Sequence, residues 1–212
     1  MHQEAINSRR QEIFRKLKNF PQFYLAGGTA LALQIGHRIS DDFDLFSDKD
    51  IPPGLLEKVE KVFENSKITL IINHPEQLSL IIDEIKVDFV KYPFPLILAL
   101  IEYQGVKMAK VPEIAAMKAY TVGRRATYKD YIDLYFIFFE KYSSLSDTIK
   151  IAIEKFKENF DQRLFLEQLV YLEDVEEEPI QFLKKKPSKK ELENFFQKEV
   201  KKIKLDEQLA EF

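Results

Sequence analysis

The chain has 212 residues, 45% of them hydrophobic and 32% charged, which is typical of a globular protein with a substantial core. Its 32 basic and 35 acidic side chains give a net charge of −3, so the overall field does not indicate a nucleic-acid binder, although a local basic surface is compatible with it. The absence of cysteine excludes disulfides, thiolate metal sites and a cysteine nucleophile.

The sequence gives no sign of membrane targeting. Its N-terminal segment is polar and lacks the apolar core of a signal peptide. The most apolar runs, residues 92–101 and 131–139, are shorter than a membrane span, and the second contains Asp133. We therefore expect a cytoplasmic protein that does not associate with a membrane.

Helices and strands alternate in the first half of the chain. Apolar spacing and turn residues predict helices at residues 2–19, 29–35 and 55–65, and strands at residues 22–26, 42–46, 68–72, 78–82 and 85–90. Residues 1–110 are therefore expected to form an α+β domain of the α/β type. Its small sheet, mixed or antiparallel, would be flanked by helices.

The second half has a helical pattern throughout. Pro112 suits a helix start, and helices are expected at residues 113–122 and 128–142. Capping-box patterns begin at Ser144 and Ser188, each ahead of a further helical segment. Residues 111–212 are therefore expected to form an all-helical C-terminal domain.

Two charged runs interrupt this helical half. An acidic run spans residues 173–178, and a lysine-rich run spans residues 184–190, with further lysines at positions 198, 201, 202 and 204. One interpretation is a solvated surface and linker. The other is a helix that contacts a polyanion, because lysines that neutralise phosphates supply sequence-independent binding. The sequence leaves both open.

Three carboxylates are candidates for a metal site. Asp42 and Asp44 are two residues apart on an expected strand and would face the same side, with Phe43 facing the core. Asp88 would lie opposite the core face of the strand at residues 85–90. If these strands are neighbours, the three acids converge, and Mg²⁺ would remove their mutual repulsion. Each acid alone is more often surface polarity than a ligand.

A double glycine precedes these acids. Gly27 and Gly28 stand between an expected strand and an expected helix, where backbone amides and the helix N-terminus can approach an anion. Thr29 adds a hydroxyl. An isolated pair of glycines is usually only a turn, but in this order with the acids the segment predicts a phosphate-binding turn. It is not a P-loop, because no Gly-Lys-Ser/Thr follows.

The motif Gly27-Gly-Thr-Ala-Leu-Ala-Leu…Gly36-His-Arg-Ile-Ser-Asp-Asp-Phe-Asp-Leu-Phe46 resembles the first motif of the AbiEii/AbiGii-type nucleotidyltransferase toxins. These belong to the polymerase-β-like nucleotidyltransferase superfamily. The segments Pro112-Glu-Ile-Ala-Ala-Met-Lys-Ala-Tyr120 and Lys129-Asp-Tyr-Ile-Asp-Leu-Tyr135 are similar to later motifs of that family. The resemblance covers about residues 20–140 and implies a nucleotidyltransferase fold, with residues 1–110 as catalytic domain and 111–212 completing the nucleotide and acceptor site.

The resemblance implies a role for each matched residue. Asp42, Asp44 and Asp88 would bind two Mg²⁺ ions, and Asp88 would also position or activate the attacking hydroxyl. The nucleotide-binding residues would be Gly27, Gly28, Thr29, Arg38, Ser40 and Lys118, with Lys118 reaching the triphosphate and acting in catalysis. Thr29 stands where the superfamily commonly has serine, and it keeps the hydroxyl.

Asp130 and Asp133 share one face of the expected helix. Asp133 stands among apolar residues and is expected to be buried with a partner, for which Arg124, Arg125 and Lys129 are the candidates. A structural ion pair between two helices and a further active-site role for Asp133 are both compatible with the sequence.

The implied function is Mg²⁺-dependent transfer of a nucleotidyl group from a nucleoside triphosphate to an acceptor hydroxyl. The resemblance extends to the toxins of bacterial toxin–antitoxin or phage-defence pairs, which implies a cognate antitoxin. Some such toxins modify tRNA 3′ ends, so RNA is a candidate acceptor. Two alternatives remain: a catalytically inactive module of the same fold that binds a nucleotide or a partner, and an RNA-binding protein that depends on the C-terminal lysines alone.

Overall fold

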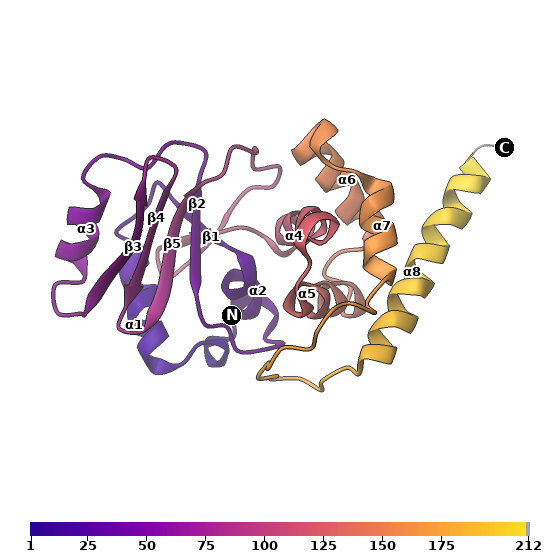
Figure 1. The fold of residues 1–212 in the computed structure, drawn as a ribbon, viewed down its shortest axis with the longest axis horizontal. Coiled ribbons are helices and arrows are strands. Elements are labelled where there is room, and N and C mark those ends of the chain that lie inside the picture. The colour runs from indigo at the N-terminus through magenta and orange to yellow at the C-terminus, as the bar shows by residue number, and fades with distance from the viewer. Residues whose placement is uncertain (211–212) are drawn as a thin grey trace. The chain divides into compact units, whose positions relative to one another are not determined.

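A computed structural model of the protein describes residues 1–210, with side chains described through residue 203. The chain divides into two compact units, Met1–Lys110 and Val111–Phe212 (Figure 1). The first unit combines a sheet with helices, and the regular elements of the second are helices. Within residues 1–210, no helix combines the length and the apolar character needed to cross a membrane.

The first unit is built on a seven-stranded mixed sheet, which confirms the expected fold class. The strands follow the order β3-β4-β5-β2-β1-β7-β6, of which the first five are labelled in Figure 1. β1 pairs in parallel with β7, and β2 pairs in parallel with β5, whereas the other neighbours are antiparallel. The bounds are β1 Tyr24–Ala26, β2 Phe43–Ser47, β3 Ile68–His74, β4 Gln77–Ile82, β5 Ile85–Lys91, β6 Ile101–Tyr103 and β7 Val106–Met108.

Aromatic side chains cover one face of this sheet. Phe43 on β2 contacts Phe14, with ring centroids 6.4 Å apart, and Phe89 on β5 lies 5.1 Å from Phe20. The helices of the unit are α1 Ser8–Leu17, α2 Gly27–Ile35 and α3 Leu55–Val62. Burial of these rings, each at most 2% exposed, provides the main hydrophobic stabilisation of this face.

The first predicted helix is shorter in the structure than expected. A 3₁₀ helix spans Gln3–Ala5, and α1 begins only at Ser8 because the Asn7 side chain caps it by accepting a hydrogen bond from the Arg10 amide. The expectation of one helix over residues 2–19 was therefore wrong at its start, because the cap at Asn7 begins a new helix and separates it from the 3₁₀ helix before it.

The sequence prediction also missed the hairpin β6–β7. Its strands have three residues each, too few to show an alternating pattern. Gln104 and Gly105 form its turn with φ values of 53° and 79°, and the second value is one that glycine adopts without strain. The hairpin matters for the fold because β7 extends the sheet beside β1.

The second unit contains helices α4 Val111–Arg125, α5 Tyr128–Phe139, α6 Leu145–Phe156, α7 Gln162–Val170 and α8 Lys189–Ala210, and a 3₁₀ helix at Lys157–Asn159. Both expected caps are present. Ser144 accepts from the Asp147 amide at 3.0 Å, and the Ser188 amide donates to Glu191 at 2.8 Å. The all-helical character expected for this half agrees with the structure.

An ion pair lies inside the second unit. Lys155 on α6 donates to Glu113 on α4 at 2.7 Å, and both side chains are fully buried. Burial lowers the pKa of Lys155, and the hydrogen bond to Glu113 opposes this shift. The pair fixes how α4 and α6 pack, because loss of either partner would leave a buried charge uncompensated.

Tyr131 on α5 predicts a pH dependence of stability. Its hydroxyl donates to the Gln168 carbonyl at 2.9 Å, and burial raises its pKa to about 12. The pKa of Tyr131 in the folded protein lies above its unfolded value near 10. The stabilisation that the protonated hydroxyl gives the folded state is therefore complete below pH 10 and is lost as the pH rises to 12.

We expect Tyr131→Phe to cost about 1 kcal/mol at pH 9 through the lost hydrogen bond. The difference in free energy of unfolding between the wild type and this variant should shrink toward pH 11. Urea unfolding at pH 9 and pH 11 measures this difference. An equal difference at the two pH values would contradict the role given to the Tyr131 hydroxyl.

Candidate active site

Two of the predicted acids face each other across neighbouring strands. Asp44 on β2 is in register with Asp88 on β5. The residues that alternate with them, Phe43, Val87 and Phe89, are completely buried on the core face. Asp44 and Asp88 therefore project from the other face of the sheet, side by side. Asp88 is nearly buried and Asp44 is partly exposed.

Asp42 lies one residue ahead of β2 and is exposed. The expected strand at residues 42–46 therefore starts one residue too early. Strand alternation does not fix the direction of the Asp42 side chain, but its short distance along the chain keeps it next to Asp44. The structure thus places Asp44 and Asp88 on one face through strand register, and Asp42 just before the start of β2.

A serine continues this row onto the next strand. Ser79 on β4 is in register with Asp88 on β5, and it is 1% exposed. The Gln77 side chain donates to the Ser79 hydroxyl at 2.9 Å. The row Asp44, Asp88 and Ser79 therefore runs across three adjacent strands and places a hydroxyl beside the third acid.

Lys86 is a polar neighbour of this row that the sequence prediction missed. It stands two residues before Asp88 on β5, so both side chains project from the same face. Its ammonium lies 2.6 Å from Asp88 Oδ2. The hydrogen bond to Asp88, with the charges of Asp88, Asp44 and Asp42, raises the pKa of Lys86. Strand alternation alone was the signal that would have identified it.

The donor chemistry of this face fits a hard divalent cation. Asp88 Oδ1 is buried and has no hydrogen-bond partner within the described residues, so a cation there would satisfy it. However, among the side chains that the structure describes, residues 1–203, no group of three or more His, Asp or Glu is placed to hold one ion. The Oδ2 atom of Asp88 is paired with Lys86 instead.

The double glycine lies directly beside the acids. α2 begins at Gly27, which has a φ of +66°. Its N-cap residue is Ala26, whose side chain makes no capping hydrogen bond. A Cβ atom at Gly27 would lie 2.7 Å from Asp44 Oδ2, and one at Gly28 would lie 2.5 Å from Arg38 Nη2. The glycines therefore bring a helix N-terminus into close contact with a carboxylate and a guanidinium.

Thr29 and Ser40 tie this turn to the segment ahead of β2. The Thr29 hydroxyl lies 2.8 Å from the Ser40 hydroxyl and also contacts the Asp42 carbonyl. Both residues are buried. These contacts hold the backbone that carries Asp42, so the hydroxyls support the acids in addition to any contact with a phosphate.

Arg10 is a second supporting residue that the sequence prediction did not identify. Its guanidinium donates to the Asp41 carbonyl at 3.0 Å and pairs with the Asp41 carboxylate at 2.8 Å. It anchors the residue immediately before Asp42 to α1. No sequence pattern indicated it, because the contact joins residues 31 positions apart.

We expect Gly27→Ala to impair the site more than the fold. A left-handed φ costs an alanine roughly 1–2 kcal/mol, and the new Cβ would also displace the Asp44 carboxylate. Thermal unfolding should show a modest loss of stability, and cation binding should weaken. Gly54→Ala is the matched control, since Gly54 has a φ of +79° but its nearest neighbour atom would lie 3.8 Å away. Equal cation binding by both variants would contradict this.

The second unit contains a separate charged cluster. Lys118 on α4 pairs with Asp130 at 2.8 Å and with Asp133 at 2.7 Å, both on α5. Asp133 is fully buried and paired, as expected, and the partner that the structure shows is Lys118. The expected candidates Arg124, Arg125 and Lys129 did not include this residue, because the packing of α4 against α5 selects it.

Two of the expected partners, Lys129 and Arg124, have other contacts, and Asp130 has a second role. Lys129 approaches Glu178 at 3.8 Å, and Arg124 stacks over Tyr120. Asp130 also accepts from the Thr127 amide at 3.0 Å, which makes it part of the cap that starts α5. The cluster around Lys118 thus links the start of α5 to α4.

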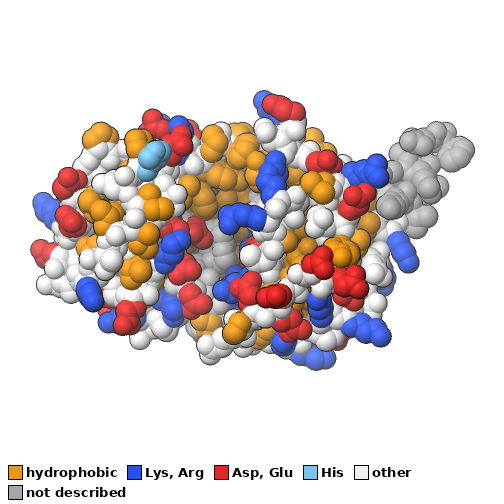
Figure 2. Space-filling model, viewed as in Figure 1, with side chains coloured by type: hydrophobic (Ala, Val, Ile, Leu, Met, Phe, Trp, Pro, Cys, Tyr) orange, Lys and Arg blue, Asp and Glu red, His pale blue; other side chains and the backbone are white. Residues whose placement is uncertain are grey.

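Nearby acids pair with several lysines of the C-terminal run. Lys184 contacts Glu140 at 2.6 Å, Lys186 contacts Glu177 at 2.8 Å, and Lys202 contacts Glu199 at 2.6 Å. On the face drawn in Figure 2, acidic and basic side chains are interspersed. These pairs favour the solvated-surface interpretation of the run. The side chain of Lys204 lies outside the described residues.

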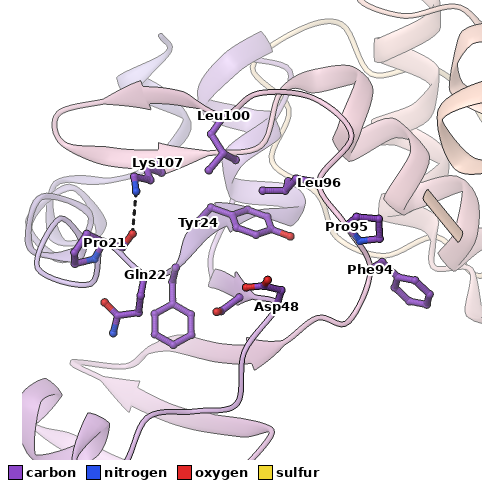
Figure 3. A pocket seen from close by; sticks show the side chains of 11 residues that line it. Pro21, Gln22, Tyr24, Asp48, Phe94, Pro95, Leu96, Leu100 and Lys107 are labelled. Atoms are coloured by element: carbon purple, nitrogen blue, oxygen red, sulfur yellow. Dashed lines mark hydrogen bonds between the residues drawn. The ribbon is translucent and has the colours of Figure 1, made fainter. Parts of the chain in front are cut away.

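A cavity of about 340 Å³ in the first unit is lined by none of the three candidate acids Asp42, Asp44 and Asp88 (Figure 3). Tyr24, Asp48, Phe94 and Leu96 line it, at the end of β1 and β2 opposite the glycine turn. Its lysine, Lys107, donates to the Pro21 carbonyl at 3.1 Å. None of the predicted site residues lines this cavity, so the candidate site is the acidic face of the sheet and the glycine turn.

Comparisons with known proteins identify the family of this chain. The model of the family described as "Nucleotidyl transferase AbiEii toxin, Type IV TA system" matches residues 12–212. An uncharacterized protein of Aquifex aeolicus (strain VF5) is 33% identical over 181 residues, which cover 84% of this chain and 86% of that protein.

Two solved structures share the fold. MenT4, a nucleotidyltransferase toxin from Mycobacterium tuberculosis H37Rv, is similar with a TM-score of 0.59 and 16% identity, over 91% of this chain and 80% of that chain. JHP933 from Helicobacter pylori has a TM-score of 0.55 and 17% identity, over 100% of this chain and 98% of that chain. Because the family model matches residues 12–212, this chain belongs to the AbiEii family of nucleotidyl transferase toxins.

Proposed function

We propose that the protein transfers a nucleotidyl group from a nucleoside triphosphate to an acceptor hydroxyl, with divalent cations bound at Asp42, Asp44 and Asp88. The observation that carries this proposal is the register of Asp44 with Asp88 on one face of the sheet, beside the glycine turn. Bound Mg²⁺ would neutralise phosphate charge and orient the reacting oxygens.

The glycine turn would hold the phosphates. The backbone amides at the start of α2 and the positive end of its dipole favour an anion. Arg38, packed against Gly28, would add a fixed positive charge. Thr29 and Ser40 keep this turn and the Asp42 segment together. These contacts would place the α-phosphorus near Asp44.

Asp88 would orient the acceptor. The acceptor oxygen attacks the α-phosphorus, its proton passes to the Asp88 carboxylate, and the bond to the β-phosphate oxygen breaks as pyrophosphate leaves. The buried position of Asp88 and its neighbour Ser79 supply a fixed environment for that hydroxyl. Positioning and charge neutralisation would account for much of the acceleration.

The acceptor and the partner are further parts of the proposal. We propose an RNA 3′ hydroxyl, with tRNA as the first acceptor to examine, although Glu140, Glu177 and Glu199 already balance the charges of Lys184, Lys186 and Lys202. Because the family is described as type IV toxin–antitoxin, we also propose toxicity opposed by a cognate antitoxin, within a phage-defence system of the cytoplasm.

The decisive experiment incubates the purified protein with Mg²⁺, each labelled triphosphate in turn and total tRNA. Labelled tRNA that requires Mg²⁺ is the expected result. A transfer signal that is unchanged by chelation of the cation would contradict the proposed mechanism.

Two observations favour the alternative of a binding module without turnover. Asp88 is paired with Lys86, and among the described side chains no group of three or more acids or histidines is placed to hold an ion. Calorimetry that shows Mg²⁺-dependent binding of a triphosphate, together with no transfer to any acceptor, would select this alternative.

A further inference from the structure

Lys86 reaches the third acid of the site from the solvent side. Its side chain is 46% exposed, whereas the Asp88 side chain is only 10% exposed. The two residues stand at alternate positions of β5, so the strand itself holds the ammonium 2.6 Å from Asp88 Oδ2. The contact is therefore built into the strand.

The two oxygens of Asp88 have different environments. Oδ2 is bound by Lys86, whereas Oδ1 is buried and has no hydrogen-bond partner among the residues that the structure describes. A buried carboxylate oxygen without a donor is unfavourable, so the carboxylate is only half satisfied by the chain itself. Asp44, one strand away in register, adds a second negative charge on the same face.

A divalent cation on Asp88 would meet the ammonium of Lys86 at close range. Two positive charges on one carboxylate repel each other, and this repulsion is stronger near a buried group than in water. Lys86 is half exposed and can swing into solvent, whereas Asp88 is held in the sheet. Binding of the cation and the Lys86–Asp88 contact therefore oppose each other.

We propose that Lys86 is a tethered cation that competes with the divalent metal for Asp88 and thereby sets the metal affinity of the site. It is a positioning residue that acts through Asp88. In the protein without metal, its ammonium compensates Asp88 and Asp44. When a cation binds, the ammonium leaves Oδ2. This inference rests on the proposed metal site at Asp88.

Binding of Mn²⁺, followed by electron paramagnetic resonance of the free ion without any triphosphate or acceptor, tests the competition. We expect Lys86→Met to bind Mn²⁺ roughly tenfold tighter than the wild type. Lys86→Arg should keep an affinity near that of the wild type. Lys91→Met is the matched control, because Lys91 lies on the same strand but pairs with Asp50 and Glu76.

Variants that carry Asp88→Asn separate this inference from the proposed function. In a protein that already carries Asp88→Asn, the added change Lys86→Met should no longer tighten Mn²⁺ binding. If Lys86→Met and Lys91→Met both bind Mn²⁺ like the wild type while Asp88→Asn binds weakly, the competition is refuted and the metal site stands. If Asp88→Asn binds as tightly as the wild type, Asp88 is no ligand, and both the competition and the proposed metal site are refuted.

The acetylation rate of Lys86 in the wild-type protein provides a second measurement. Mass spectrometry should show that Mg²⁺ increases labelling of Lys86 several-fold, because the ammonium is displaced from Asp88, while labelling of Lys91 stays constant. Unchanged labelling of Lys86 at saturating Mg²⁺ would overturn the proposal, since the ammonium would then remain on Asp88 when the cation is bound.

Discussion

Asp44→Asn and Asp88→Asn are each expected to reduce nucleotidyl transfer by roughly 10³-fold or more while the protein remains folded. Each change keeps the size of the side chain and removes one negative charge from a pair in register on adjacent strands.

The measurement is the initial rate of label transfer at saturating Mg²⁺, combined with thermal unfolding of each variant. Asp48→Asn is the matched control. It makes the same chemical change just beyond β2, at the cavity end of the strand and away from the glycine turn. Transfer by Asp44→Asn at the rate of Asp48→Asn would remove Asp44 from the mechanism. Loss of transfer in all three variants would point to a general effect of charge instead.

The position of the acids on one face was predictable because strand alternation is local. Phe43 and Val87 are apolar and turn to the core, so Asp44 and Asp88 have to project from the other side. The same rule would have revealed Lys86. That β2 and β5 are neighbours could not be read from alternation, because the intervening residues could pair in several orders.

Features that depend on packing were the ones that sequence reasoning missed. The partner of Asp133 is selected by how α4 and α5 meet, and Lys118 carries no local signal of that contact. Arg10 supports Asp41 across the fold of the first unit. The hairpin β6–β7 is too short for a periodic pattern. In each case the deciding contact is distant in sequence or spans too few residues to show periodicity.

Lys118→Met is expected to destabilise the second unit by roughly 3–5 kcal/mol. The change removes the ammonium that pairs with Asp130 and with the fully buried Asp133, and so leaves negative charge inside the helical unit without its counter-ion. Urea unfolding measures the loss. A single variant does not separate a structural role from a role in transfer, because an unstable protein is also inactive.

The triple variant Lys118→Met, Asp130→Asn and Asp133→Asn makes that separation. It removes the charges of all three side chains, and the new amide at position 130 keeps an oxygen for the cap on Thr127, so most of the lost stability should return. If Lys118 contacts the triphosphate, as its motif predicts, this folded variant should still transfer label roughly 10²-fold more slowly than the wild type. Transfer at the rate of the wild type would show that the cluster serves only to join α4 to α5.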